Sequence, residues 1–369
     1  MNAAPLPSNL PALTSLRFFA ALMVLAYHYT LVWAPDAQAA SGLLQKGYLG
    51  VDFFFVLSGF ILTHVYLAAR EGGRFRFDDF IWARLARIYP LHFVTTLIAI
   101  VVLAIGYRIG AIADDPVYLS YVVKTLAMVH AWGTTDHFGL NEPSWSISAE
   151  WAAYLAFPLY LVLVVALRKR PIAFTLAALG ALVGADALAR AALGKPLTQL
   201  AFDFGILRIA PEFLLGCALY TLALRLPLSA TAARGGLAAS IVATLALLHF
   251  QGPDLVTIVA MGAVILFAAA GARNAAPASN LGHPALVYLG EISYAIYLVH
   301  RIVEHALIDV FAPLTGIALP VPVLFLIATL STLLIAAALH HVIEKPFRQW
   351  MRALPPSRWL GQTPAAQRD

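Results

Sequence analysis

The sequence predicts an all-α membrane protein with about ten transmembrane helices in one bundle. Of its 369 residues 61% are hydrophobic and only 12% are charged, and the mean hydropathy is +0.80. So few charges cannot cover a soluble globule of this size. Apolar segments of about 20 residues, enough to cross the hydrocarbon core, recur along nearly the whole chain. We therefore expect residues 1–350 to form one integral membrane domain.

Ten windows have the length and hydropathy of a membrane span. They lie near residues 14–33, 49–69, 89–107, 148–167, 171–193, 205–225, 234–251, 254–271, 286–311 and 320–341. The seventh and eighth are short and are divided by a Gln-Gly-Pro-Asp turn at 251–254. A further apolar patch at 117–132 is too short to span and predicts a re-entrant or surface helix. Residues 351–369 are expected to be a short, disordered cytoplasmic tail.

The distribution of basic residues predicts the orientation of the bundle. With the N-terminus in the cytoplasm, 16 of the 24 Lys and Arg residues fall on inward loops and the tail, and five on outward loops. This asymmetry follows the positive-inside rule, so we expect both termini to be cytoplasmic in a bacterial inner membrane. Orientation also explains the net charge of +5 without a nucleic-acid partner.

Two ionisable residues stand out in the first span. Arg17 and His28 are eleven residues apart, which is about 16 Å along a helix and three turns plus about 20°, so they share a face. A fixed cation near the cytoplasmic end, with an imidazole deeper on the same face, suits an anionic cofactor that enters from inside. The alternative is an arginine that reaches the interface and a hydrogen-bonded interior histidine.

Further charged residues lie at the next two spans. Asp52 starts the second span and could be catalytic or could interact with the helix dipole. Arg84 and Arg87 lie on an inward loop at a spacing that would place both on one helix face, as two forks for phosphate oxygens. Taken alone, the pair could equally be a positive-inside signal.

The start of the fourth span combines hydroxyls, indoles and a carboxylate: Ser144, Trp145, Ser148, Glu150 and Trp151. Stacking indoles beside a carboxylate suit a sugar, although interfacial anchors and helix caps would have the same composition. In the ninth span Tyr294 and His300 are weaker candidates, and structural pairing between helices explains them about as well. No HExxH, P-loop, dinucleotide fingerprint or GxSxG occurs, and we expect no metal.

Together these segments resemble the acyltransferase-3 family of membrane acyltransferases. Arg17 and His28 match its Arg, ten residues, His signature, and Arg84 with Arg87 match its RxxR pair. The segments 50–60, 144–151, 208–216, 289–300 and 344–347 look like its other blocks. The order of the blocks is kept over residues 14–350.

The resemblance implies transfer of an acyl group, usually acetyl, from cytoplasmic acyl-CoA to a hydroxyl of a surface or lipid-linked carbohydrate. Arg17, Arg84 and Arg87 would then hold the donor. His28 would act as general base or, alternatively, carry the acyl group, with Glu150 or Asp52 assisting. The substrate-binding candidates are Ser144, Trp145, Ser148, Trp151, Tyr294 and His300. Some relatives carry an extra outward esterase-like domain. We expect none in this chain, so its membrane domain would act alone or with a partner.

A proton-coupled transporter or flippase is the competing interpretation. Helices with buried His, Glu and Arg can also form a proton pathway. No inverted repeat supports it. An enzyme should consume acyl-CoA in detergent, where no gradient exists, whereas a transporter should act only across sealed membranes.

Overall fold

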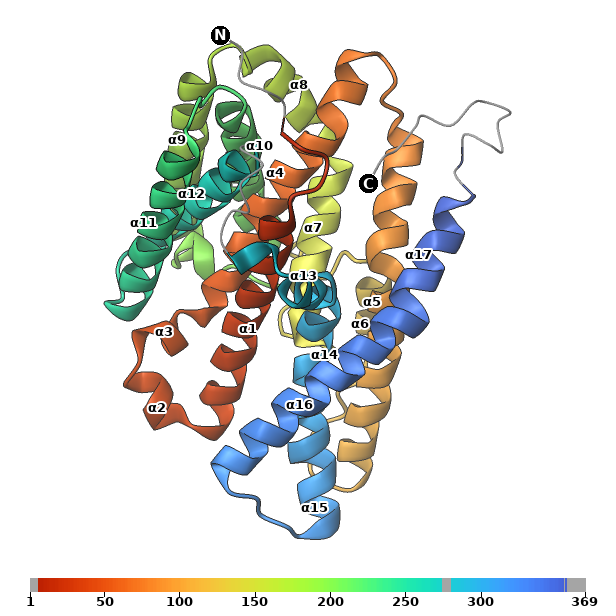
Figure 1. Cartoon of the computed structure of the whole chain (residues 1–369). Coiled ribbons are helices and arrows are strands. Elements are labelled where there is room, and N and C mark those ends of the chain that lie inside the picture. The colour runs from red at the N-terminus through yellow and green to blue at the C-terminus, as the bar shows by residue number, and fades with distance from the viewer. Residues whose placement is uncertain (1–5, 274–279, 355, 357–369) are drawn as a thin grey trace.

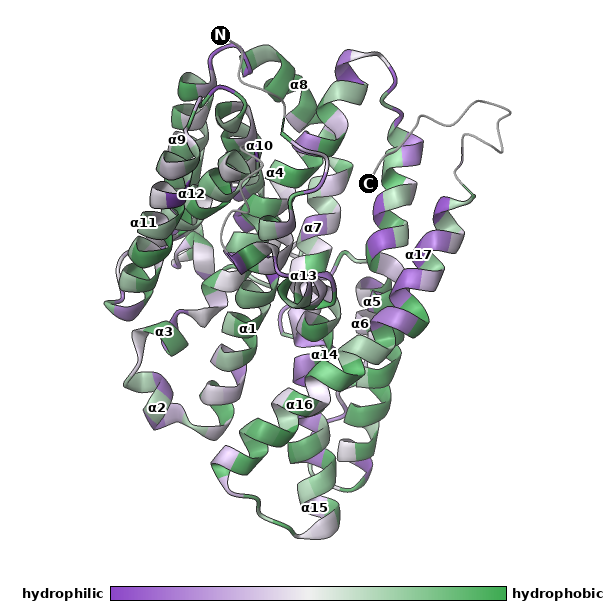
Figure 2. Cartoon of the chain, viewed as in Figure 1, coloured by the Kyte–Doolittle hydropathy of each residue, from purple (hydrophilic) through white to green (hydrophobic). Residues whose placement is uncertain are grey.

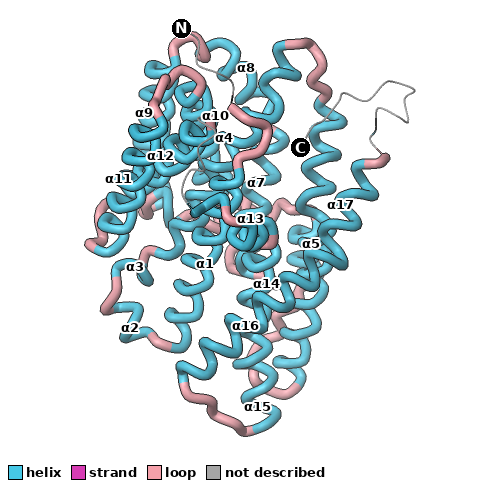
Figure 3. The backbone as a smooth tube through the Cα atoms, in the orientation of Figure 1, coloured by secondary structure: helices cyan, strands magenta, loops and turns pink. Residues whose placement is uncertain are grey.

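The computed structural model describes residues 6–273, 280–354 and 356. In this part of the chain the helices form one bundle (Figure 1), and most of their residues are hydrophobic (Figure 2). No strand occurs among the described residues (Figure 3). Eight helices are long and apolar enough to cross a membrane, and two bent pairs raise the number of spans to as many as ten. The predicted all-α, multi-pass fold is confirmed.

The first half of the bundle runs from α1 to α8. Its helices are α1 (Pro11–Trp33), α2 (Pro35–Ala39), α3 (Gly42–Gln45), α4 (Gly50–Glu71), α5 (Phe77–Arg108), α6 (Leu119–Leu126), α7 (Trp145–Leu155) and α8 (Phe157–Leu167). Short 3₁₀ turns precede α4 (Gly47–Leu49) and α7 (Glu142–Ser144).

The second half runs from α9 to α17. Its helices are α9 (Pro171–Leu193), α10 (Gly205–Ala223), α11 (Ala230–His249), α12 (Asp254–Ala272), α13 (Pro284–Glu291), α14 (Ser293–His305), α15 (Ala312–Thr315), α16 (Val321–Leu339) and α17 (Lys345–Arg352). Short 3₁₀ turns lie at Leu197–Gln199 and Asn280–Gly282, and π-helical turns at Ala306–Phe311 and His340–Glu344.

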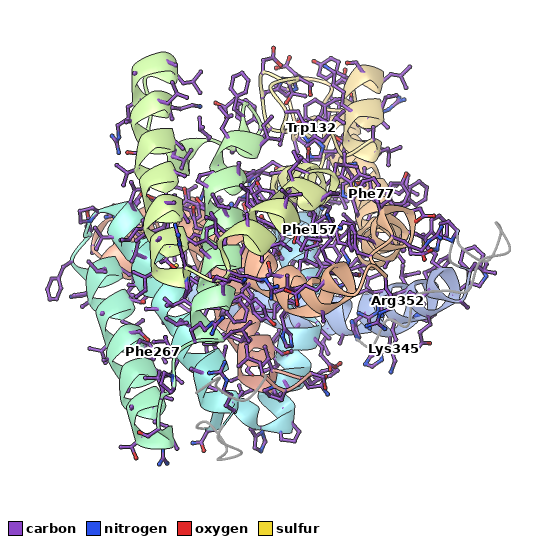
Figure 4. The ribbon with its side chains drawn as sticks, turned by 90° about the horizontal axis from the view of Figure 1, so that it is seen from above. Phe77, Trp132, Phe157, Phe267, Lys345 and Arg352 are labelled. Carbon is purple, nitrogen blue, oxygen red and sulfur yellow. The ribbon has the colours of Figure 1, made fainter. Side chains whose placement is uncertain are left out.

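Two predicted elements differ from the structure. Helix α5 begins at Phe77, so Arg84 and Arg87 lie within a helix and not on a loop. The patch at 117–132, predicted to be too short to span, contains the eight-residue helix α6. The last span continues through a π-turn into the charged helix α17, whose Lys345 and Arg352 lie at the edge of the bundle (Figure 4). Most of the predicted tail, residue 355 and residues 357–369, lies outside the described residues.

The two bent spans have identifiable local causes. Helices α7 and α8 meet at 58° beside Pro158, whose ring clashes with the carbonyl four residues earlier. Helices α13 and α14 meet at 59° where the Ser293 hydroxyl donates to the Gly290 carbonyl at 2.8 Å and competes with the helical hydrogen bond. These bends direct the start of α7 and all of α14 into the centre of the bundle, where the candidate site lies.

Helices α4 and α10 cross at the centre of the bundle at close range. A Cβ atom on Gly59 would lie 2.0 Å from the Phe213 carbonyl oxygen, and one on Gly216 would lie 1.9 Å from the Val56 carbonyl oxygen. Small residues let the two backbones touch, the usual basis of helix association in lipid. Gly59 and Gly216 are thus close helix-packing positions.

Replacing Gly216 with alanine is expected to lower the free energy of unfolding by about 1–3 kcal/mol, because α4 and α10 must separate. Gly180→Ala on α9 is the matched control, since a Cβ there meets nothing within 4 Å. The control should be neutral or stabilising, because alanine favours a helix over glycine by about 0.5–1 kcal/mol. Thermal unfolding in detergent measures both. Equal effects of the two substitutions would contradict the role of the crossing.

Candidate active site

A small cavity of about 140 Å³ gathers five of the residues that the sequence predicts to be functional. These are Arg17 from α1, Arg84 and Arg87 from α5, Glu150 from α7 and Tyr294 from α14. Four helices that are distant in sequence therefore contribute to one wall. Along α1 the cavity lies nearer the beginning of the helix than His28 does, on the side that the positive-inside rule predicts to face the cytoplasm.

Two arginines of the cavity, Arg84 and Arg87, are oriented by aromatic rings. The Arg84 guanidinium donates to the Tyr66 hydroxyl at 3.3 Å and lies 5.6 Å from the centre of that ring. The Arg87 guanidinium lies 5.4 Å from the centre of the Tyr294 ring and pairs with Glu344. Aromatic faces fix the plane of a guanidinium while leaving donors for an oxygen ligand.

The Glu344 partner comes from the π-turn between α16 and α17. Its carboxylate also lies 2.9 Å from the His340 imidazole, and its side chain is 1% exposed. Inside the cavity, Ser58 donates to Glu150. The lining residues include three arginines and one carboxylate, Glu150. With Glu344, the partner of Arg87, counted as well, the charges still sum to one positive. This excess of positive charge suits an anionic ligand.

His28 lies further along α1, outside this cavity, and its hydrogen bonds define its tautomer. Its Nδ1 lies 2.9 Å from the Val24 carbonyl oxygen and 3.1 Å from the His300 Nε2. The His300 Nδ1 in turn donates to the Tyr297 carbonyl at 2.7 Å, so its Nε2 is an acceptor. His28 therefore carries its proton on Nδ1 when neutral. The Nε2 lone pair is left available as a base.

Arg17 and His28 share a helix face, as the spacing predicts. Both side chains are directed towards α14: Arg17 lines the cavity with Tyr294, and His28 contacts His300 two turns further on. Tyr294 and His300, the weaker substrate-binding candidates, therefore lie beside Arg17 and His28.

A group of charged residues lies beside His28. The Glu142 carboxylate lies 4.0 Å from the His28 Nε2 and 2.7 Å from the Arg301 guanidinium. Arg301 also pairs with Glu304, one turn along α14. The one signal for Glu142 in the sequence is its place two residues before Ser144, where the polar start of the fourth span begins. Nothing in the sequence pairs it with α14.

The remaining predicted residues lie elsewhere. Asp52 is fully buried and accepts two hydrogen bonds from Arg208, at 3.0 and 2.6 Å. The Trp145 ring lies under the same guanidinium, 5.2 Å away. Trp151 packs against the hydrophobic core. None of these three lines the cavity beside Arg17.

Ser144 and Ser148 hold the polypeptide that follows α6. The Ser148 hydroxyl accepts from the Ala131 amide at 3.0 Å and donates to the Met128 carbonyl at 2.9 Å. The Ser144 hydroxyl lies 3.1 Å from the His130 Nε2. These hydrogen bonds fix the connecting segment against the start of α7.

His130 makes stability depend on pH. Burial lowers its pKa to about 3, against about 6.5 in an unfolded chain. Below pH 6.5 the unfolded state binds a proton that the folded state excludes, so stability present at neutral pH is lost as the pH falls. At pH 5 the loss from this group is about 2 kcal/mol.

His130→Gln should therefore flatten the decrease in thermal stability between pH 7 and pH 5. His137→Gln is the control, since the His137 side chain is 52% exposed. If the two variants show the same pH dependence, His130 is not the group that titrates.

A sequence profile described as an acyltransferase domain matches residues 10–341 of the chain. The chain belongs to the acyltransferase-3 family. This confirms the predicted family and the prediction of a membrane acyltransferase, in place of the transporter alternative.

Curated relatives carry corresponding names. The chain is 34% identical over 319 residues to the acyltransferase MdmB of Streptomyces mycarofaciens. This match covers 80% of this chain and 79% of the relative. It is 27% identical over 366 residues to the putative peptidoglycan O-acetyltransferase YrhL of Bacillus subtilis. This match covers 92% of this chain and 55% of the relative.

A third relative is the peptidoglycan O-acetyltransferase OatA of Listeria monocytogenes, 28% identical over 169 residues that cover 44% of this chain and 25% of the relative. The match thus spans little more than half of YrhL and a quarter of OatA. No solved structure matches the chain. In this acyltransferase-3 protein, the family's Arg, His and RxxR signatures occupy two neighbouring parts of one bundle.

Proposed function

We propose that this protein transfers an acetyl group from acetyl-CoA to a hydroxyl of a carbohydrate at the bacterial cytoplasmic membrane. One observation carries the proposal. The cavity gathers Arg17, Arg84 and Arg87 at one end of α1, and an available imidazole base, His28, lies about three turns further along the same helix face.

The structure of acetyl-CoA suits the separation between the three arginines and His28. CoA has phosphates at one end and a thioester at the other, with a long, flexible pantetheine arm between them. Guanidinium groups bind phosphate oxygens by charge-assisted hydrogen bonds. Phosphates held by Arg17, Arg84 and Arg87 would direct the arm between α1 and α14 towards His28, with Glu150 and Tyr294 along the way.

The Nε2 lone pair of His28 defines the reaction step. The acceptor hydroxyl gives its proton to this nitrogen as its oxygen bonds to the thioester carbonyl carbon. The carbon–sulfur bond then breaks, and the CoA thiolate takes the proton from the imidazolium and leaves as free thiol. General-base catalysis of this kind contributes about 10²–10⁴ in rate.

The names of the relatives support a carbohydrate acceptor. Two of them are peptidoglycan O-acetyltransferases by name. The chain's multi-pass fold would place its acceptor at the membrane surface. A lipid-linked or surface glycan is therefore the acceptor that we propose.

The test is release of free thiol from acetyl-CoA by the purified protein in detergent, with cell-envelope glycans as acceptors. Arg84→Gln and Arg87→Gln should each raise the KM for acetyl-CoA by about 10- to 100-fold, the loss of a charged hydrogen bond. Arg108→Gln, at the exposed far end of α5, is the control.

Acetyl-pantetheine sharpens this test, because it carries the thioester without the nucleotide phosphates. The two cavity variants should use it as well as the unchanged protein does. An equal loss with both donors would show that Arg84 and Arg87 do not bind phosphate. No thiol release from folded protein with any acceptor would overturn the proposed function.

A further inference from the structure

Helix α14 holds both members of a histidine–glutamate pair at the candidate base. The His28 Nε2 lies 4.0 Å from the Glu142 Oε1. On its other side the His28 Nδ1 lies 3.1 Å from the His300 Nε2. The second Glu142 oxygen, Oε2, lies 2.7 Å from the Arg301 guanidinium. Because His300 and Arg301 are consecutive residues of α14, one helix sets the separation of the base and the carboxylate.

The turn that carries Glu142 is fastened to α14 on both sides of the carboxylate. Glu142 begins the 3₁₀ turn that precedes α7. Just before it, the Asn141 side-chain amide donates to the Leu298 carbonyl at 3.0 Å. Just after it, the Pro143 carbonyl accepts from the Tyr297 hydroxyl at 3.0 Å. Glu142 therefore cannot move away from α14 unless these buried hydrogen bonds break, which is costly.

Arg301 orients the Glu142 carboxylate without cancelling its charge for His28. The guanidinium binds one oxygen of Glu142 and is shared with Glu304, one turn along α14. The other oxygen of Glu142 is the one that faces the imidazole. The positive charge of Arg301 is thus divided between two carboxylates, and one of them lies beside the base.

The two carboxylates that the sequence suggests as partners of His28 have other contacts. Glu150 accepts a hydrogen bond from Ser58 in the arginine cavity. Asp52 belongs to a fully buried ion pair. Glu142 is the carboxylate that the structure places beside the base.

We infer that Glu142 is a positioning residue of the reaction, and that its carboxylate stabilises the imidazolium of His28. The inference rests on the proposed function and adds a residue to it. When the acceptor hydroxyl gives its proton to Nε2, a positive charge forms 4.0 Å from the Glu142 Oε1. A fixed negative charge at that distance favours the step. Glu142 takes no proton, because the proton stays on Nε2 until the CoA thiolate leaves with it.

The same separation leaves the base free before the reaction. A distance of 4.0 Å is too long for a hydrogen bond, so Glu142 does not occupy the Nε2 lone pair. The side chains of His28 and Glu142 are 13% and 22% exposed. Both are therefore largely shielded from water, where their electrostatic interaction is stronger than in bulk solvent.

A double-mutant cycle of acceptor-dependent thiol release tests the inference. Glu142→Gln keeps the size of the side chain and an oxygen for Arg301, and removes the charge. It should lower kcat about 10- to 100-fold, the effect of one charge 4.0 Å from a partly exposed ion, and leave the KM for acetyl-CoA unchanged. In a His28→Gln background the same substitution should change kcat less than about twofold, because no imidazolium forms.

Glu71→Gln is the matched control, with thermal unfolding as the check on folding. Glu71 pairs with Arg168 and is 33% exposed, so the variant also removes one carboxylate from a partly exposed ion pair. It should retain full activity. If Glu142→Gln does not fold, Glu142→Asp replaces it in the cycle. Aspartate keeps the charge but withdraws it from Nε2, so kcat should fall only when His28 is present.

The outcomes separate this inference from the proposed function. Equal losses of kcat with and without the His28 imidazole would show a structural role for Glu142 and overturn the inference. A folded Glu142→Gln protein with undiminished kcat, beside an inactive His28→Gln protein, would also overturn it and leave the proposed function standing. If the unchanged protein releases no thiol with any acceptor, the proposed function itself fails.

Discussion

His28→Gln is expected to lower kcat by about 10²–10⁴-fold, the contribution of a positioned general base. Glutamine keeps a polar side chain of similar length but has no basic nitrogen in place of Nε2. The surrounding hydrogen bonds show why the effect should be large. The Val24 carbonyl and His300 hold the proton of neutral His28 on Nδ1. Nε2 is therefore the basic nitrogen, and glutamine has no such base.

The measurement is acceptor-dependent thiol release, with thermal unfolding as the check on folding. His249→Gln, at the end of α11, is the matched control and should retain full activity. A folded His28→Gln protein with undiminished turnover would exclude His28 as the base. Intact mass after incubation with acetyl-CoA alone then separates the two chemical routes, because only the acyl-histidine route leaves an acyl group on the protein without acceptor.

The number and position of the spans follow from hydropathy, because a membrane-crossing helix needs a run of about 20 apolar residues. A hydropathy window measures length and not direction. It therefore treats 148–167 and 286–311 as straight, although both are bent by almost 60°. Pro158 gives a local signal for the first bend. The second depends on a serine hydroxyl, which is no signal by itself.

The arginine cavity was more predictable than the contacts of Glu142. Arg17, Arg84 and Arg87 belong to short motifs that the sequence shows directly. The contacts of Glu142 with His28 and Arg301 join residues that are 114 and 159 positions apart, and helical periodicity has no information at that range. The indoles near Glu150 show what composition alone leaves open. Their composition suggests a sugar platform, but Trp145 lies under Arg208 and is 8% exposed.

The second large effect is expected at the buried Asp52–Arg208 pair. Asp52→Asn should lower the free energy of unfolding by about 3–5 kcal/mol, because it leaves a buried guanidinium without its carboxylate. The Arg208 side chain is 3% exposed and the Asp52 side chain is fully buried. Asp78→Asn is the matched control. Its pair with Arg76, at 2.8 Å, is 38% and 28% exposed, so the loss there should be about 1 kcal/mol or less.

A double variant, Asp52→Asn with Arg208→Gln, separates structure from catalysis at this position. Removing both charges should restore most of the stability, because replacing a whole buried pair costs far less than breaking it. Thermal or denaturant unfolding in detergent measures the recovery, and no recovery would contradict the pairing as the cause. The thiol release of the restored protein then decides the role predicted for Asp52. A loss of kcat like that of His28→Gln means that its carboxylate acts in the reaction. Retained turnover means that Asp52 serves to hold Arg208 between α4 and α10.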